Sequence, residues 1–244
     1  MNKKHRSLRI TLISVFSVIV LLFSTFFIYV SIYYHADSKA DTYLASNDEV
    51  EVTRGNEIVF TPKNQTIKAG LVFYPGAKVE ATAYAPLCSS LAKEGILTYL
   101  IQMPYNLAFF DSGAGKGIPT KHPEVSHWYL SGHSLGGAMA ASFIGSDTSE
   151  YEGLILLASY STADLSKTSL KTLTIYGSED KVLNKSKYQD CLKNLPSSNR
   201  EVVLEGGNHS GYAYYGPQKG DGTASISKDE QIAKTVMAVT SLLA

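Results

Sequence analysis

A glycine-rich segment around Ser134 carries the strongest chemical signal in the sequence. Ser134 is the central residue of Gly132–Gly136, which has the G-x-S-x-G pattern of a nucleophile elbow. A strand-like run, Trp128–Ser131, precedes this segment, and a helix-like run of small residues follows it. A strand that turns sharply into a helix holds the serine in a strained conformation, and flanking glycines avoid collisions with neighbouring backbone. We therefore predict Ser134 as a nucleophile; the alternative is a glycine-rich turn in which the serine only caps the helix.

A serine nucleophile needs a general base, and elimination among the histidines leaves His209. Two of the others flank the apolar N-terminal segment, one adjoins the nucleophile, and two precede it, whereas triads on such elbows run in the order Ser, acid, His. These five are His5, His35, His133, His122 and His127. His209 follows the strand-like run Glu201–Leu204, where loops at strand ends build the active sites of α/β sheets. The alternative is a surface-loop histidine.

The acid of such a site should lie between the serine and the histidine, at the end of another strand. Asp180 follows the run Leu173–Tyr176 and meets this condition. It would accept a hydrogen bond from His209 Nδ1–H, fix the tautomer of the ring and stabilise the imidazolium. Glu179 is its neighbour, and Asp164 is the competing candidate; either aspartate could instead cap a helix.

The remaining element of the predicted site is a pair of backbone N–H groups for an oxyanion. One is that of Leu135, directly after the nucleophile, and the other is that of Ala77 in the loop Tyr74–Lys78. Gly76 permits close approach of the backbone in this loop. Pro75 followed by glycine is also an ordinary turn signal.

The N-terminal segment predicts a membrane span. No residue from Ile10 to Ala36 carries a formal charge, and about 20 apolar residues suffice to cross a bilayer. Four basic residues precede the run: Lys3, Lys4, Arg6 and Arg9. The positive-inside rule then keeps the N-terminus cytoplasmic and sends the body outside. The alternative is a cleaved signal peptide with Ser38 and Ala40 at the cleavage site, although the apolar core of such peptides is only about 7–15 residues long.

The chain thus divides into four parts. We predict a cytoplasmic basic segment over 1–9, a transmembrane signal-anchor over 10–34, a polar tether over 35–48 and a catalytic domain over 49–244. This makes the protein a single-pass protein of the cell membrane with an extracytoplasmic catalytic domain.

The predicted domain alternates strand-like and helix-like segments. The strands are predicted at Val50–Thr53, Ile58–Thr61, Gly70–Tyr74, Leu97–Gln102, Trp128–Ser131, Leu154–Ala158, Leu173–Tyr176 and Glu201–Leu204. The helices are predicted near Ala81–Lys93, Ser134–Gly145, Lys185–Asn194 and Lys228–Leu243. The later strands are continuous apolar runs, which is typical of parallel strands covered on both faces. The pattern predicts an α/β fold with a mostly parallel central sheet flanked by helices.

The composition narrows the possible classes of protein. With 44% hydrophobic and 18% charged residues, the chain is neither wholly disordered nor a coiled coil. The four N-terminal basic residues precede any acid, so the rest of the chain is net acidic and a poor partner for nucleic acid. We expect Cys88 and Cys191 to be free buried thiols. No Cys/His cluster has zinc-ligand spacing, and we expect neither a metal nor another cofactor.

Four segments together resemble the α/β-hydrolase superfamily, most closely its small bacterial "alpha/beta hydrolase fold-5" type, which is related to dienelactone hydrolases. The segments are YPGAKVEATAYAPL from Tyr74, GHSLGGAMAAS from Gly132, LTIYGSEDKVLN from Leu173 and EGGNHSGYAYYGPQKGDG from Glu205. The resemblance implies an α/β-hydrolase fold with Ser134 as nucleophile, Asp180 as acid and His209 as base. It also implies an oxyanion loop at Gly76 and Ala77.

The sequence departs from this family pattern at two places. The oxyanion loop begins Pro75-Gly76 rather than His-Gly, and Ser112–Lys121 is glycine-rich where relatives often carry a helix. No long insertion is available for a cap domain, so we expect a minimal cap or none and an open site. Residues Tyr212–Pro217 would line this site or only pack their own loop.

The function predicted from these residues is that of a membrane-anchored serine hydrolase that cleaves an ester or related acyl bond. Its substrate would be a small-molecule or lipid-like acyl compound. Two alternatives remain at this point: an acyltransferase with the same three residues, and a non-catalytic, hydrolase-like binding module at the cell surface.

Overall fold

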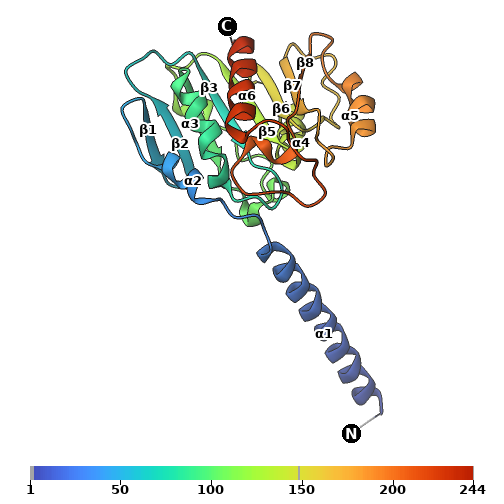
Figure 1. Cartoon of the computed structure of the whole chain (residues 1–244). Helices are drawn as coiled ribbons and strands as arrows, with labels where there is room; N and C mark the ends of the chain where they lie inside the picture. Colours follow the sequence, from blue (N-terminus) through green and yellow to red (C-terminus); the bar gives the residue numbers. More distant parts are fainter. Residues whose placement is uncertain (1–2, 148, 244) are drawn as a thin grey trace. The chain divides into compact units, whose positions relative to one another are not determined.

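The protein is described by a computed structural model that covers residues 3–147 and 149–243. The chain forms two compact units, one ending at Tyr33 and the other beginning at Tyr34 (Figure 1). We call the second unit the body and describe each unit by itself.

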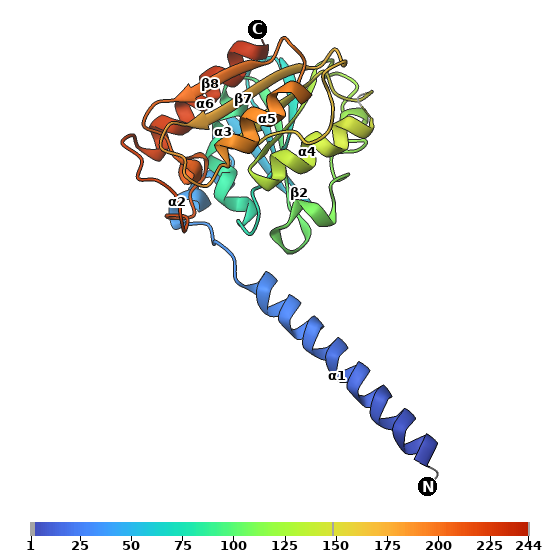
Figure 2. The same ribbon diagram turned by 90° about the vertical axis from the view of Figure 1, so that its right-hand side faces the viewer.

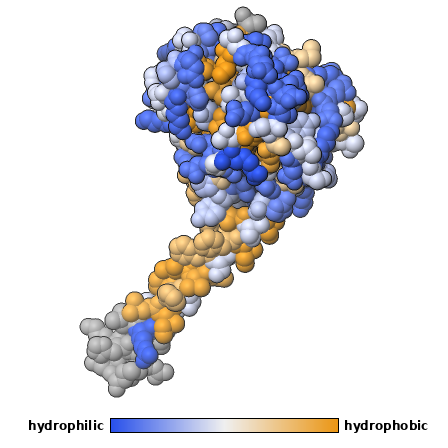
Figure 3. Space-filling model, turned by 90° about the vertical axis from the view of Figure 1, so that its left-hand side faces the viewer, coloured by the Kyte–Doolittle hydropathy of each residue, from blue (hydrophilic) through white to orange (hydrophobic). Residues whose placement is uncertain are grey.

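The first unit is a single helix, α1 (Lys3–Ser31). Within it, Thr11–Ser31 has a mean hydropathy of 2.5 and is long and apolar enough to cross a membrane. Its 21 residues rise by about 31 Å, close to the thickness of a hydrocarbon core of about 30 Å. Figure 3 shows the mostly apolar surface of this helix in orange. A signal sequence has the same character, so the helix alone does not show an anchor.

The body is built on an eight-stranded sheet with the order β1-β2-β4-β3-β5-β6-β7-β8. The strands are β1 (Val50–Arg54), β2 (Glu57–Pro62), β3 (Ala69–Tyr74), β4 (Ile96–Ile101), β5 (Trp128–His133), β6 (Gly153–Leu157), β7 (Lys171–Gly177) and β8 (Arg200–Leu204). The first two strands pair antiparallel, and β2 pairs antiparallel with β4. All later pairs are parallel. Every residue of β3, β5 and β6 is buried, because helices cover both faces of the central sheet.

Helices on the two faces of the sheet enclose two hydrophobic cores. The helices of the body are α2 (Ser38–Asp41), α3 (Ala85–Lys93), α4 (Leu135–Ser146), α5 (Lys185–Cys191) and α6 (Lys228–Leu243). Apolar side chains of α3 and α6 share one core, and those of α4 belong to the other. Figures 1 and 2 show α3 and α6 on one face of the sheet and α4 on the opposite face. The α/β fold with a mostly parallel sheet is therefore confirmed, and each predicted strand and helix is present within a few residues of its expected bounds.

The connection between β4 and β5 contains no α-helix in the described residues. It consists of loops and three short 3-10 turns at Pro104–Asn106, Ala108–Phe110 and Pro119–Lys121. This agrees with the glycine-rich sequence over Ser112–Lys121. Cys88 and Cys191 are both free and buried, as expected.

The segment predicted as a polar tether, residues 35–48, is folded onto the body. Asp37 caps α2 by accepting hydrogen bonds from the N–H groups of Lys39 and Ala40, and Ala40 is fully buried in a core. The Asp37 N–H also donates to Tyr214 O, at 2.8 Å. The prediction of a free tether differs from the structure because a short, mostly polar sequence does not reveal a single buried alanine or a local cap.

Candidate active site

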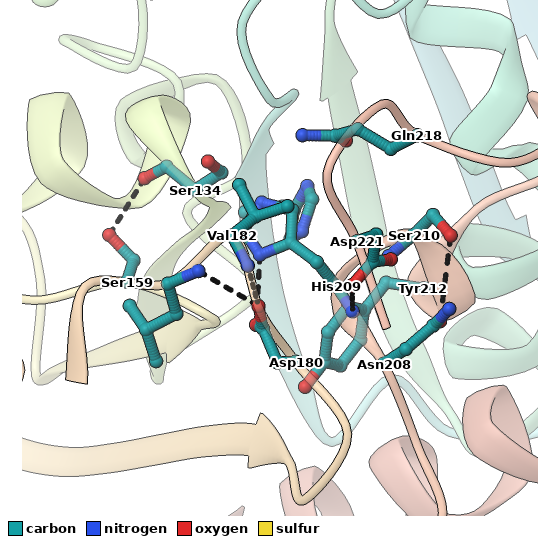
Figure 4. Close-up of polar contacts among 12 residues, drawn as sticks. Ser134, Ser159, Asp180, Val182, Asn208, His209, Ser210, Tyr212, Gln218 and Asp221 are labelled. Carbon is teal, nitrogen blue, oxygen red and sulfur yellow. Dashed lines mark hydrogen bonds and ion pairs between the residues drawn. The ribbon is translucent and has the colours of Figure 1, made fainter. Parts of the chain in front are cut away.

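Ser134 occupies a strained turn between β5 and α4. Its φ of 52° and ψ of −123° lie in a region that costs a non-glycine residue about 1–3 kcal/mol. Two hydrogen bonds hold this conformation. The Ser134 N–H donates to Leu157 O at 2.9 Å, and the Ser159 hydroxyl donates to Ser134 O at 2.7 Å (Figure 4). The elbow expected from the sequence is present, with the serine at the N-terminus of a helix.

The glycines beside Ser134 are required by close backbone packing. A Cβ atom on Gly132 would lie 2.6 Å from Gly136 C, and one on Gly136 would lie 2.2 Å from Pro75 O. Real Cβ atoms do not approach backbone so closely, so a larger residue would move the main chain. The elbow therefore packs directly on the loop that follows β3, as the glycine pattern indicates.

Asp180 and His209 form a buried pair at the ends of the adjacent parallel strands β7 and β8. His209 Nδ1 lies 2.8 Å from Asp180 Oδ2, and the two residues are only 1% and 2% exposed (Figure 4). The N–H groups of Val182 and Leu183 donate to Asp180 Oδ1, at 2.9 and 2.8 Å. Three donors thus orient one carboxylate, and charge-assisted bonds of this kind are among the strongest in proteins.

The other ring nitrogen of His209 is available for proton transfer. Nε2 is buried and has no hydrogen-bond partner in the described chain. His209 and Ser134 line the same pocket, with a volume of about 250 Å³. No hydrogen bond joins the two side chains among the described residues, and such bonds are often long in the absence of substrate. The other lining residues are Leu135, Ala138, Ala158, Ser159, Tyr160, Val182, Leu183 and Asn184.

The two predicted oxyanion donors differ in their placement. Leu135 begins α4 and lines the pocket. Ala77 is half-buried and does not line it, although its loop packs against Gly136. No hydrogen bond from Leu135 N or Ala77 N is present within the described residues, whereas the Gly76 N–H donates to Tyr84 Oη at 3.0 Å.

A buried Tyr84–His133 pair supports this loop and was not recognised from the sequence. Tyr84 Oη accepts from the Gly76 N–H and lies 2.7 Å from His133 Nδ1, within hydrogen-bond distance. Burial, and secondarily the nearby His209, holds the pKa of His133 well below its ordinary value. The His133 ring is therefore neutral, and its centroid lies 4.6 Å from that of His209.

Two further side chains hold the loop that carries His209, and sequence reasoning missed both. Asp221 accepts hydrogen bonds from the N–H groups of His209 and Ser210, at 3.1 and 2.9 Å. The buried Gln231 side chain accepts from Asn208 N at 3.0 Å and donates to Asn208 O at 2.8 Å. The side chains of Asp221 and Gln231 thus fix the backbone on both sides of the histidine. Figure 4 shows Asp221 beside His209.

The residues that competed for these roles lie elsewhere. Asp164 is exposed and, within the described part of the chain, accepts hydrogen bonds from Ser166 alone, which lower the pKa of its carboxyl group. His122 and His127 pair with glutamates at the surface. The three tyrosines after His209 are buried in the core that α3 and α6 share and do not line the Ser134 pocket. They are Tyr212, Tyr214 and Tyr215.

A parallel sheet with a strained serine at a strand-to-helix turn, and a histidine–aspartate pair beside it, defines the class of α/β hydrolases. The sequence model of the alpha/beta hydrolase family matches residues 70–233, and the chain belongs to this family. Among the described residues, no group of three or more His, Cys, Asp or Glu side chains is placed to hold a metal ion.

Solved structures with a similar fold include two hydrolases. One is a predicted CIB-like hydrolase from Thermoplasma acidophilum, with a TM-score of 0.55 and 18% identity over 79% of this chain and 97% of the other. The second is a dienelactone hydrolase from Anabaena variabilis, with a TM-score of 0.59 and 14% identity over 79% of this chain and 98% of the other. At identities this low, the likeness shows a similar fold and nothing more. Among curated proteins, none matches the chain.

Proposed function

We propose that the protein is a serine hydrolase that cleaves an ester or related acyl bond. The observation that carries this proposal is the buried 2.8 Å contact between Asp180 and His209 at the edge of the pocket that Ser134 lines. A carboxylate on Nδ1 fixes the tautomer whose Nε2 accepts a proton. Few structural roles explain a buried imidazole with one nitrogen paired and the other facing a pocket.

The proposed reaction proceeds through an acyl-enzyme. Ser134 Oγ attacks the substrate carbonyl while its proton passes to His209 Nε2, and Asp180 stabilises the resulting imidazolium. The carbonyl oxygen becomes an oxyanion, held by the N–H groups of Leu135 and Ala77. His209 then gives its proton to the leaving oxygen as the acyl–oxygen bond breaks. Water repeats these steps, releases the acid and restores the serine.

The walls of the pocket support an acyl compound as the substrate. Leu135, Ala138, Val182 and Leu183 contribute apolar surface beside the serine. These side chains would contact the acyl part of an ester, while the leaving group would extend toward solvent. The substrate is thus a small-molecule or lipid-like acyl ester, and the three residues that act on it require no cofactor.

A fluorophosphonate probe tests the assignment of the nucleophile. It should label the full-length protein, and Ser134→Ala should abolish labelling and lower turnover of an activated ester by about 10³-fold or more. His209→Ala should be about as damaging, since such residues act as a unit. Ser166→Ala, an exposed serine in another turn, is the matched control and should retain both activities. Wild-type turnover by Ser134→Ala would disprove the mechanism.

We also propose that α1 anchors the protein in the cell membrane with the body outside. The length and hydropathy of Thr11–Ser31 and the basic residues before it support this arrangement. Protease added to spheroplasts should digest the body, and full-length chain should fractionate with membranes. A body that stays protected until the membrane is broken would contradict the orientation, and a shortened, soluble chain would indicate a cleaved signal.

A further inference from the structure

The body begins a few residues after α1, and its first residue is held within the body. Tyr34, its first residue, donates its N–H to Lys78 O at 2.7 Å and accepts from Glu80 N at 2.9 Å. Only two residues separate it from Ser31, the last residue of α1. Three Cα steps span at most about 11 Å, whatever direction the chain takes. If α1 crosses a bilayer, Tyr34 therefore lies in or next to the lipid headgroups, which extend about 5–8 Å beyond each side of the hydrocarbon core.

A cluster of exposed aromatic side chains lies beside Tyr34. We call residues 105–110 the aromatic loop; Tyr105, Phe109 and Phe110 are 48%, 70% and 45% exposed. The ring centroids of Tyr105 and Phe110 are 5.6 Å apart, and those of Phe109 and Phe110 are 5.7 Å apart. An exposed cluster of large apolar side chains is a typical feature of a contact surface.

Backbone hydrogen bonds connect this loop to Tyr34. The Lys78 N–H donates to Asn106 O at 2.7 Å, while Lys78 O accepts from Tyr34 N. Lys78 is thus hydrogen-bonded to both Tyr34 and Asn106, which connects the aromatic loop to the first residue of the body. Figures 1 and 2 show the loop after β4, in green, and the segment before α2, in blue, at the same end of the body.

Two residues of the aromatic loop have a strained backbone conformation. Tyr105 and Asn106 have φ values of 54° and 55°, in the left-handed region that residues other than glycine adopt only at a cost. The hydrogen bond to Lys78 holds this backbone in place. Residues 75–78 hold Asn106 through Lys78 and also pack on Gly136 beside Ser134. The aromatic loop and the candidate active site therefore contact the same loop.

We propose that the aromatic loop inserts into the headgroup layer of the bilayer that α1 spans, so that the rim of the Ser134 pocket faces lipid. Aromatic rings favour this interfacial region, where their apolar parts leave water without entering the hydrocarbon core. The inference rests on the anchoring part of the proposed function. It gives the body a fixed membrane-facing side and brings its pocket to acyl esters held in the bilayer.

Tryptophan fluorescence in vesicles tests the proposal. The full chain is reconstituted in phosphatidylcholine–phosphatidylglycerol vesicles with and without bromine on the upper acyl carbons. Phe109→Trp should emit at a shorter wavelength than a tryptophan exposed to water. Its emission should also be weaker in vesicles of brominated lipid than in vesicles of ordinary lipid. Met237→Trp, on α6, is the matched control, because its site is 69% exposed and lies outside the loop. It should show neither effect, and the buried Trp128 contributes equally to both samples.

Each outcome decides between the proposals. The two variants could emit at the same wavelength and show no bromine quenching while the chain floats with the vesicles. This result overturns insertion and leaves the anchor intact. A blue shift of Phe109→Trp without bromine quenching also overturns insertion, because it indicates that the new side chain contacts protein rather than lipid. A chain that does not float with vesicles overturns the anchor and insertion together. Fluorophosphonate labelling in the same samples reports separately on the hydrolase proposal.

Discussion

The nucleophile and the base of the candidate site are held in different ways. Ser134 is positioned by its own backbone, in a strained turn whose glycines pack on a neighbouring loop. His209 lies in a loop after β8, and its ring and backbone are fixed by the side chains of Asp180, Asp221 and Gln231. The position of Ser134 therefore depends on backbone packing, whereas the position of His209 depends on side-chain hydrogen bonds. Substitutions near Ser134 and near His209 should therefore differ in how they change catalysis and stability.

Among substitutions that keep both the nucleophile and the base, the largest effect should come from Asp180→Asn, on the histidine side. An amide can donate to His209 Nδ1 and stabilise the wrong tautomer, so kcat should fall by about 10⁴-fold with little change in the folded structure. The measurement is turnover of an activated ester together with circular dichroism. Asp164→Asn replaces the rejected acid in an exposed turn and should leave kcat unchanged. If Asp164→Asn were the more damaging variant, the assignment of the acid would be wrong.

Gly136→Ala should damage the serine side through the backbone. The new Cβ would lie 2.2 Å from Pro75 O, so the main chain must move. We expect a loss of about 1–3 kcal/mol in the free energy of unfolding. A displacement of about 1 Å should also lower kcat by about 10²-fold. Gly113→Ala is the control, since nothing lies within 4 Å of its Cβ. Labelling of Gly136→Ala by fluorophosphonate at the wild-type rate would show that the turn tolerates the shift.

Asp221→Ala should have a smaller effect, because it removes support from the loop rather than a reacting group. Two backbone donors, on His209 and Ser210, lose their acceptor, and each such hydrogen bond contributes about 0.5–1.5 kcal/mol. We expect kcat to fall by about tenfold while KM stays near wild type. Asp221→Asn keeps one acceptor oxygen and should recover part of the loss. A change confined to KM would argue against a positioning role.

The smallest effect concerns His133 and the stability of the fold at low pH. Burial lowers its pKa well below the ordinary 6.5, so below about pH 6.5 the unfolded chain binds a proton that the folded chain does not. The free energy of unfolding should therefore decrease as the pH falls, by at most about 1.4 kcal/mol per pH unit from this residue.

His133→Asn tests this contribution, because the amide group can hydrogen-bond Tyr84 in place of Nδ1 but does not titrate. Urea unfolding between pH 5 and 7 should give a flatter dependence for this variant than for wild type. Identical slopes for wild type and His133→Asn would show that His133 is not a source of acid sensitivity.

The sequence by itself determined the elements and the elbow. Apolar runs of four to six residues predict the parallel strands, and the glycines around Ser134 predict a turn that only small residues permit. Asp180 and His209 could be predicted to meet because each follows a strand, and β7 and β8 pair in parallel, which brings those strand ends together. These inferences depend on local pattern and on one rule of sheet topology.

Only the tertiary structure decided how the site is supported and where the first residues of the body, from Tyr34 on, pack. Gln231 and Asn208 are 23 positions apart, and Tyr84 and His133 are 49 apart, so no local pattern relates them. The aromatic loop and Tyr34 likewise meet through Lys78, from a third part of the chain. The physical reason is the same in each case. Periodicity and turn chemistry act over a few residues, whereas a hydrogen bond between distant segments exists only once the whole chain has closed around it.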